Sequence, residues 1–359
     1  MKSNNIISWE TIDSIEKLVA IKVEWEEFYL NNSIDIPFIN ITWLTIWIKY
    51  YWQKNWQLKV LIGRSNDSIF TIMPMYIQID KSIFSKSTMY PIGIGEPELK
   101  EVSTEYLDII IKPEFEELTL KKIKKWILDL KVDEIIWRGI LQNSNVLNLF
   151  QSFDQTLRKP NATRYIVHIQ SWSVKKLSKN MRSRYRRGLN QLSKLDAEIK
   201  WIKKEDINQY WQIMKDFHQS RWLGRSNTGA LCSEEFNQFH TELRRQSPEN
   251  IAMSAIWVNG IPIALHYYFM DSSTLYFYQS GWNENEYAHL SPGLLLHLWG
   301  IENTDKLYYD FMMGKKCDSY KAKFSPHQQS MHNVNFIFNP IKVNTYQVIK
   351  KLNTYFYNS

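Results

Sequence analysis

The sequence predicts an α/β (α+β) protein of two tandem domains, each with a mixed, largely antiparallel sheet flanked by helices. Three observations carry this prediction. The 359 residues exceed the size at which one hydrophobic core stops growing. The order helix, helix, antiparallel strands, helix, strand occurs twice along the chain. Between the two copies, Lys159-Pro160-Asn161 predicts a boundary that separates residues 1–158 from residues 159–359.

Helix and strand periodicities define the elements of the first half. Apolar residues three and four positions apart indicate helices, and apolar runs bounded by Gly, Asn and Asp indicate strands. We expect, in order, helices at 12–30 and 43–51, strands at 58–62, 69–77 and 105–111, a helix at 114–130, a strand at 134–138 and a helix at 143–155.

The second half repeats this kind of succession. Asn259-Gly260 between two apolar runs predicts a two-residue hairpin turn, and Ser173 is expected to cap a long helix. The expected order is a strand at 164–169, the helix at 173–195, a strand at 197–203, helices at 205–222 and 233–246, strands at 251–258, 261–270 and 274–281, a helix at 292–305, a strand at 307–312 and a helix at 343–356.

Composition is typical of a reducing compartment. Cys232 and Cys317 are the only cysteines, so no disulfide framework is expected, and no pattern with metal-ligand spacing occurs. Residues 1–10 lack a signal-peptide pattern, and no apolar run approaches the roughly 20 residues of a membrane span. We therefore expect a cytoplasmic protein that binds no metal.

The net charge of +7 is concentrated in residues 175–194. A solvated helix face usually mixes both signs, whereas this stretch holds eight basic residues and no acidic one, and the rest of the chain sums to −1. Such a face suits phosphates of a donor, a nucleotide- or lipid-linked acceptor, an RNA or an anionic membrane surface. DNA is not an expected partner. The eight residues are Lys175, Lys176, Lys179, Arg182, Arg184, Arg186, Arg187 and Lys194.

Three short motifs in the second half occur together in one known superfamily. They are FHQSRW at 217–222, SPGLLL at 291–296, and YYDFMMG at 308–314 followed by YKAKF at 320–324. In this order and spacing the chain resembles the GNAT superfamily, specifically its BioF2-like, CelD-type branch, which is related to the double-domain Fem peptidyltransferases. The resemblance covers residues 160–330 well and residues 1–155 by architecture alone. It implies an acyltransferase.

The SPGLLL motif is the expected donor site. A donor pyrophosphate needs backbone N–H groups at a helix N-terminus, where Pro suits the first turn and Gly permits close approach. Most superfamily members carry a Q/R-x-x-G-x-G/A loop here, and this chain lacks its leading residue and first Gly. The resemblance implies acyl-CoA, with acetyl-CoA as the expected co-substrate, while an acyl carrier protein and aminoacyl-tRNA stay open. The donor-binding residues would be Ser291, Pro292, Gly293 and Leu294.

Three residues are expected to carry the chemistry. The resemblance gives Lys321, in the YKAKF segment, a role in stabilising the transfer transition state, and Tyr320 beside it belongs to the same expected site. Asp310 is a lone carboxylate in an aromatic strand, so it is either buried with a partner or available to accept a proton from an ammonium substrate.

The acceptor is expected to meet a second set of side chains. His218 and Arg221 are three residues apart on one helix and therefore neighbours, although a helix C-cap pair would look the same. The other expected substrate-binding residues are Trp222, which would stack on the acceptor, His266 in a strand, and Arg182 and Arg186 on the basic helix.

Three functions remain open from the sequence. The first is an N-acyltransferase that moves an acyl group from acyl-CoA to the amine of an amino sugar or amino acid, for example in cell-envelope polysaccharide synthesis. The second is a Fem-type transfer from aminoacyl-tRNA, ranked lower because coiled-coil heptads and long basic insertions are missing. The third is a non-catalytic accessory protein with a degenerate donor loop.

Overall fold

The computed structural model describes residues 6–32, 36–81, 85–153, 160–223, 230–314 and 319–357. Besides short 3-10 turns, the first half contains β1 (Ile7–Ile12), α1 (Ile15–Ala20), α2 (Lys22–Asn31), α3 (Ile41–Tyr51), β2 (Trp56–Ser65), β3 (Ser68–Asp80), β4 (Lys86–Pro91), β5 (Ile110–Ile111), α4 (Glu116–Asp129), β6 (Glu134–Leu141) and α5 (Asn145–Gln151).

The second half is arranged similarly. It contains β7 (Ala162–His168), α6 (Lys179–Leu192), β8 (Ala197–Trp201), α7 (Ile207–Leu223), α8 (Glu234–Gln246), β9 (Ile251–Val258), β10 (Ile261–Met270), β11 (Thr274–Trp282), α9 (Glu284–Tyr287), α10 (Pro292–Asn303), β12 (Tyr308–Gly314), β13 (His327–Ile337) and α11 (Pro340–Tyr357).

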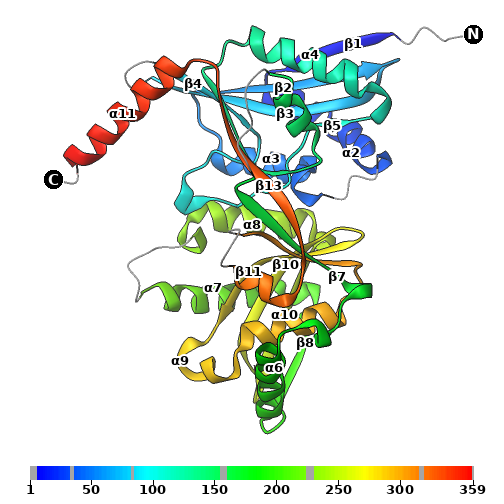
Figure 1. The fold of residues 1–359 in the computed structure, drawn as a ribbon, viewed down its shortest axis with the longest axis vertical. Coiled ribbons are helices and arrows are strands. Elements are labelled where there is room, and N and C mark those ends of the chain that lie inside the picture. The colour runs from blue at the N-terminus through cyan, green and yellow to red at the C-terminus, as the bar shows by residue number, and fades with distance from the viewer. Residues whose placement is uncertain are drawn as a thin grey trace, which may run out of the picture.

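One sheet runs through both halves (Figure 1). Within the described ranges it has thirteen strands: twelve in the order β1-β2-β3-β4-β6-β13-β7-β12-β11-β10-β9-β8, and β5 at the side of β3. The fold class is as predicted, a mixed and largely antiparallel sheet flanked by helices. Parallel pairing joins β4 to β6 and β11 to β12.

The strand order reads almost the same from either end. Each half contributes an antiparallel run followed by a parallel pair, and β7 and β13, both from the second half, join the two runs at the centre. β7 pairs with β12 on one side and with β13 on the other, and β13 pairs in turn with β6 of the first half. Figure 1 shows β13 crossing from one half to the other.

The chain after β13 also lies against the first half. In α11, Lys342 forms an ion pair with Asp133 at 2.8 Å, and the Tyr346 hydroxyl donates to Asp80. The division into residues 1–158 and 159–359 stays a prediction. β13 from Met331 onward and the first part of α11, which that division assigns to the second unit, nevertheless pack on the first.

Several predicted elements are wrong in detail. The helix expected at 12–30 is two helices that meet at Ile21, and the expected strand at 105–111 is regular over Ile110–Ile111 alone. The long basic helix begins at Lys179 with Ser178, not Ser173, as its N-cap, because the Ser178 hydroxyl accepts the Met181 N–H. Strands β1, β4 and β13 were not predicted. The Asn259-Gly260 hairpin turn is confirmed, with φ of 50° and 74°.

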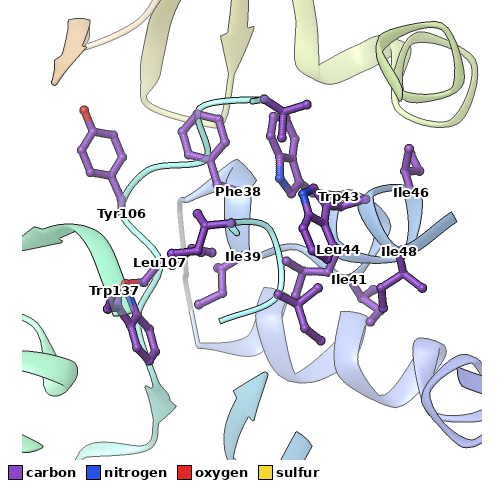
Figure 2. Close-up of a cluster of buried hydrophobic side chains, with 14 of the residues drawn as sticks. Phe38, Ile39, Ile41, Trp43, Leu44, Ile46, Ile48, Tyr106, Leu107 and Trp137 are labelled. Atoms are coloured by element: carbon purple, nitrogen blue, oxygen red, sulfur yellow. Dashed lines mark hydrogen bonds between the residues drawn. The ribbon is translucent and has the colours of Figure 1, made fainter. Parts of the chain in front are cut away.

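The largest core cluster extends across both halves, and it includes Tyr106 and Leu107 of the segment expected to be a strand. Figure 2 shows aromatic and aliphatic side chains of α3 and the preceding turn packed together, with Leu107 and Trp137 near them. Leu107 is buried and accepts the Trp137 indole N–H at 3.1 Å, while the Tyr106 N–H bonds to Gly139 at 3.1 Å. The irregular segment around Leu107 therefore satisfies its backbone against β6.

Candidate active site

A gap between two neighbouring strands is the central feature of the candidate site. β11 and β12 run parallel and pair over Thr274–Tyr276 and Tyr308–Asp310. Beyond these residues β11 continues to Trp282 and β12 to Gly314, and no pairing between them occurs over this stretch of described chain. Strands that diverge in this way leave unpaired backbone groups and room for a ligand between them.

A pocket of about 330 Å³ is lined by Ser280 and Trp282 in the unpaired end of β11 and by Tyr320 and Phe324 in the turn that follows β12. Ser291, Pro292, Gly293 and Leu294 all line it at the start of α10, which brings together the four residues expected to bind the donor. A Cβ added to Gly293 would meet no atom within 4 Å, so this position faces open space. The first N–H groups of a helix have no partners within it, and with the helix dipole they attract an anion.

The basic helix α6 supplies a cation to this helix start. Arg184 lines the pocket, and its Nε donates to the Ser291 hydroxyl at 2.8 Å. The close packing depends on Gly188, because a Cβ there would lie 2.9 Å from the Leu290 carbonyl oxygen. Lys323 also lines the pocket. Both cations are exposed, and among the described residues neither belongs to an ion pair.

Two uncharged histidines form part of the pocket wall. His266 of β10 and His297 of α10 have ring centroids 4.4 Å apart. Their Nδ1 atoms bond to the hydroxyls of Tyr268 and Tyr309, at 3.2 and 2.7 Å. Burial lowers the pKa of His266 to about 3 and holds the pKa of His297 well below its usual range. Both are therefore neutral near pH 7 and suit hydrogen bonding to a ligand better than proton transfer.

Tyr320 and Lys321 differ in their surroundings. Tyr320 is 46% exposed and lines the pocket. Lys321 is half-buried at the diverging end of β12, where its Nζ donates to the Met313 carbonyl at 2.6 Å. Burial lowers the pKa of the Lys321 ammonium, while the carboxylates of Glu105 and Asp310 act in the opposite direction.

Asp310 is outside the pocket lining and is fully engaged. Its side chain has 0% exposure, and Arg164 forms an ion pair with it at 2.7 Å. The Met312 N–H donates to its other oxygen at 2.7 Å, and the Tyr106 hydroxyl lies 3.4 Å from the same oxygen. This is the buried and paired alternative that the sequence left open. Its role as a proton acceptor stays a prediction.

The residues expected to bind the acceptor do not converge. His218 lies on α7, which crosses β11 so closely that a Cβ on Gly281 would be 2.4 Å from the Met214 carbonyl oxygen. Helices α7 and α10 lie on opposite faces of the sheet. Tyr267 of β10 contacts Trp211 of α7, whereas its neighbour His266 contacts His297 of α10, and successive residues of a strand point to opposite faces.

Arg221 and Trp222 lie in the last turn of α7, and their side chains are outside the described residues. Arg182 is half-buried and donates to the carbonyls of Lys175, at 3.0 Å, and Leu177. Arg182 therefore stabilises the turn before α6. It was expected from the sequence to bind substrate, and this structural role was not predicted. Arg186 is exposed, in keeping with a contact surface.

Sequence reasoning missed several residues of this region. Arg184 belongs to the basic run, but no sequence signal distinguishes it from Arg182. His297 could have been found, since it follows Gly293 by four residues and shares its helix face. Glu105 and Arg164 had no signal, because their neighbours come from distant parts of the chain.

Comparisons with known proteins agree with this geometry. Residues 179–322 match the family described as Acetyltransferase (GNAT) domain, a range that includes β11, β12 and all of the pocket lining except Lys323 and Phe324. The second half of the chain therefore contains a GNAT acetyltransferase domain. A search of curated proteins found no match.

Solved structures show that the fold extends over the whole chain. FemX is 10% identical, with a TM-score of 0.60 over 95% of this chain and 99% of its own. The C-terminal domain of a protein assigned as a lysylphosphatidylglycerol synthetase, from Agrobacterium fabrum, is 9% identical, with a TM-score of 0.57 over 92% and 95%. A conserved protein of unknown function from Bacteroides thetaiotaomicron is 11% identical, with a TM-score of 0.54 over 92% and 100%.

Two further searches of the described residues were negative. No group of three or more His, Cys, Asp or Glu side chains within them could hold a metal ion. None of the helices they form combines the length and apolar character needed to cross a membrane.

Proposed function

We propose that this chain is an N-acyltransferase that moves an acyl group, acetyl in the simplest case, from acyl-CoA to the amine of an amino sugar or amino acid. The observation that carries the proposal is the pocket lined by the unpaired end of β11, the start of α10 and the turn after β12. Arg184 and Lys323 at this pocket suit a pyrophosphate. Cell-envelope polysaccharide synthesis is the proposed setting, and the cytoplasm the proposed location.

The chemistry follows from the groups around the gap. The amine attacks the thioester carbonyl, and a tetrahedral oxyanion forms before the thiolate leaves. An ammonium placed at the oxyanion stabilises it as its charge develops, which is the role we assign to Lys321. Tyr320, which lines the pocket and is 46% exposed, would protonate the departing thiolate, and the proton lost by the amine nitrogen would restore the Tyr320 hydroxyl.

A second candidate is transfer from aminoacyl-tRNA to an acceptor, and one observation favours it. The basic face contains Lys175, Lys176, Lys179, Arg184, Arg186, Arg187 and Lys194, all exposed, and no ion pair joins any of them to another described residue. An RNA backbone, a nucleotide- or lipid-linked acceptor, or an anionic surface would all suit such a face. The likeness to FemX adds only the shared fold.

Calorimetric titration with CoA and acetyl-CoA, beside a tRNA titration, tests the proposal. We expect CoA to bind and to raise the melting temperature, since a ligand at 100 times its Kd stabilises a protein by about 2.7 kcal/mol. Gly293→Phe should abolish this binding by filling the pocket, and Gly293→Ala is the matched control because a Cβ there meets nothing. Binding of tRNA with indifference to CoA would favour the second candidate. Indifference to both would favour a non-catalytic accessory protein.

A further inference from the structure

A segment of the first half reaches β12 at the point where β12 leaves β11. Glu105 lies on the irregular segment before β5 and is 7% exposed. Its Oε2 accepts the N–H of Met313 at 2.8 Å, across 208 residues of sequence. Tyr106 follows it with φ of 61°, a left-handed conformation that is uncommon for a residue other than glycine. In Figure 2 the Tyr106 ring points away from Leu107 and Trp137.

Glu105 and Lys321 bind the same residue of β12. Glu105 accepts from the N–H of Met313, and Lys321 Nζ donates to its carbonyl oxygen at 2.6 Å. The residue before it, Met312, has φ of 62°. The register between β12 and β7 shifts between Asp310 and Met313, and pairing resumes at Met313–Arg164 and Gly314–Thr163. Two side chains, one from each half of the chain, also bind the N–H and the carbonyl of Met313.

The charges around this point are close to balanced and largely buried. Glu105 and Asp310 are the acids, and Arg164 and Lys321 the bases. The titratable neighbours from surrounding elements are Tyr106, Tyr276 and His297. Burial raises the pKa of Glu105 to about 7, and Lys321 opposes that rise. Arg164 forms an ion pair with Asp310 at 2.7 Å. Glu105 is therefore the carboxylate whose charge Lys321 balances.

We infer that Glu105 is a positioning residue of the transfer site, through which the first half holds the diverging end of β12 and sets the position and charge of Lys321. The first half is thus a structural part of the active site. That this site carries out a transfer reaction rests on the proposed function, whereas the contacts of Glu105 and Lys321 with Met313 are independent of it.

The first test reads Lys321 directly and requires no substrate. The protein is labelled with ¹³C at lysine Cε, the Lys321 signal is assigned with Lys321→Arg, and its chemical shift is followed against pH. In Glu105→Gln we expect the Lys321 titration to move to lower pH, because an anion that favours the ammonium has been removed. Glu96→Gln is the matched control. Glu96 is 8% exposed, its pKa is also raised to about 7 by burial, and it binds Val102 N–H and the Trp47 indole.

An unchanged Lys321 titration in Glu105→Gln, or an equal displacement in Glu96→Gln, would overturn the inference. If Glu105→Gln does not fold, the reciprocal measurement replaces it. Lys321→Met should displace the carboxyl titration of ¹³C-labelled Glu105 to higher pH, since coupling between two charges acts on both. A Glu105 titration that is the same with and without Lys321 also contradicts the inference.

A second test applies once CoA binding has been shown. Glu105→Gln should lower kcat at least tenfold and leave the donor KM unchanged, because the pocket residues are untouched. Its pH–rate profile should shift together with the Lys321 titration, which a purely structural role would not produce. Normal kcat in Glu105→Gln with a displaced Lys321 titration would refute the positioning role while leaving the proposed function intact. Absence of CoA binding in the wild type would refute the proposed function and leave the positioning of Lys321 by Glu105 to be decided by the first test.

Discussion

The two halves of this protein place the same parallel pair of strands in opposite environments. In the second half, β11 and β12 pair over three residues each and then open into a pocket. In the first half, β4 and β6 pair over Thr88–Met89 and Glu134–Ile135. Beyond that pair, the chain around Leu107 bonds to Trp137 and Gly139 of β6 and occupies the space.

This difference shows how one architecture gives a site in one copy and a support in the other. Two diverging strands leave a space between them. Whether that space stays open or is filled by another segment of the chain determines whether that half of the protein can bind a ligand there. The helix that corresponds to α10 also differs, because residues Glu114, Glu116 and Glu117 surround the start of α4. Acids at that position repel a pyrophosphate.

The largest effect is expected at Lys321. Lys321→Ala should lower kcat by about 10²–10³ with little change in donor affinity, because the ammonium meets charge only as the oxyanion develops. Lys321→Arg should restore the positive charge but not the compact geometry of the ammonium, and it should therefore recover little of the lost kcat. Steady-state kinetics measure both, and a raised donor KM with normal kcat would show that Lys321 grips a phosphate instead.

Reversing charge at the pocket mouth should have the next largest effect. Arg184→Glu combined with Lys323→Glu should weaken CoA binding by about tenfold or more, since hydrogen bonds to charged groups are each worth about 1.5–3 kcal/mol. Arg186→Glu with Arg187→Glu, on the same helix but outside the pocket lining, is the control. Calorimetry at low salt makes the comparison sharpest. Equal losses in both pairs would indicate a diffuse field and no specific phosphate site.

The halves should also respond oppositely to pH. Burial raises the pKa of Glu96 from 4.5 to about 7, so the folded state binds the extra proton, and this contribution to stability is lost as pH rises from 4.5 to 7. Burial lowers the pKa of His266 from 6.5 to about 3, so its contribution is lost as pH falls below 6.5.

Urea unfolding at pH 5 and pH 7 tests this contrast. Relative to the wild type, Glu96→Gln should gain stability at pH 7 compared with pH 5, and His266→Gln should gain it at pH 5 compared with pH 7. Parallel pH dependence in the two variants would contradict the opposite signs. The unfolding slope, m, should stay constant if each variant unfolds in the same way.

The smallest effect is expected when the acids of the first half are removed. Glu114→Gln, Glu116→Gln and Glu117→Gln together should leave CoA binding at one site per chain, because the space beside β6 is already filled. A second CoA per chain in calorimetry would show that the three acids, and not the segment packed beside β6, prevent CoA from binding to the first half.

Local signals explain what could be predicted from the sequence. The Asn259-Gly260 turn and the Ser291–Leu294 helix start are encoded in adjacent residues, and both were located correctly. The segment 105–111 reads as a strand because of its apolar and β-branched residues, yet Tyr106 and Leu107 bond irregularly to β6, and Asp108 and Ile109 bond to the start of α5. Its burial was predictable, and its partner was not.

Long-range contacts explain what could not be predicted. β13 begins with four consecutive polar residues, His327 to Ser330, which is typical of a surface loop, and its neighbours β6 and β7 come from both sides of the predicted boundary. Glu105 and Arg164 reach the site across 208 and 146 residues from their partners. No periodicity within a short window reports such pairs.

The return of β13 to the first half bears on how the chain acquires its structure during synthesis. β6 cannot gain its second neighbour until residues 327–337 have left the ribosome, and the Gly139–Asn333 hydrogen bond alone spans 194 residues. Contacts so far apart in sequence slow folding and extend the time for which strand edges are unpaired. The nascent first half therefore emerges with β6 as an open edge, available to a chaperone or to another copy of itself until the last strand arrives.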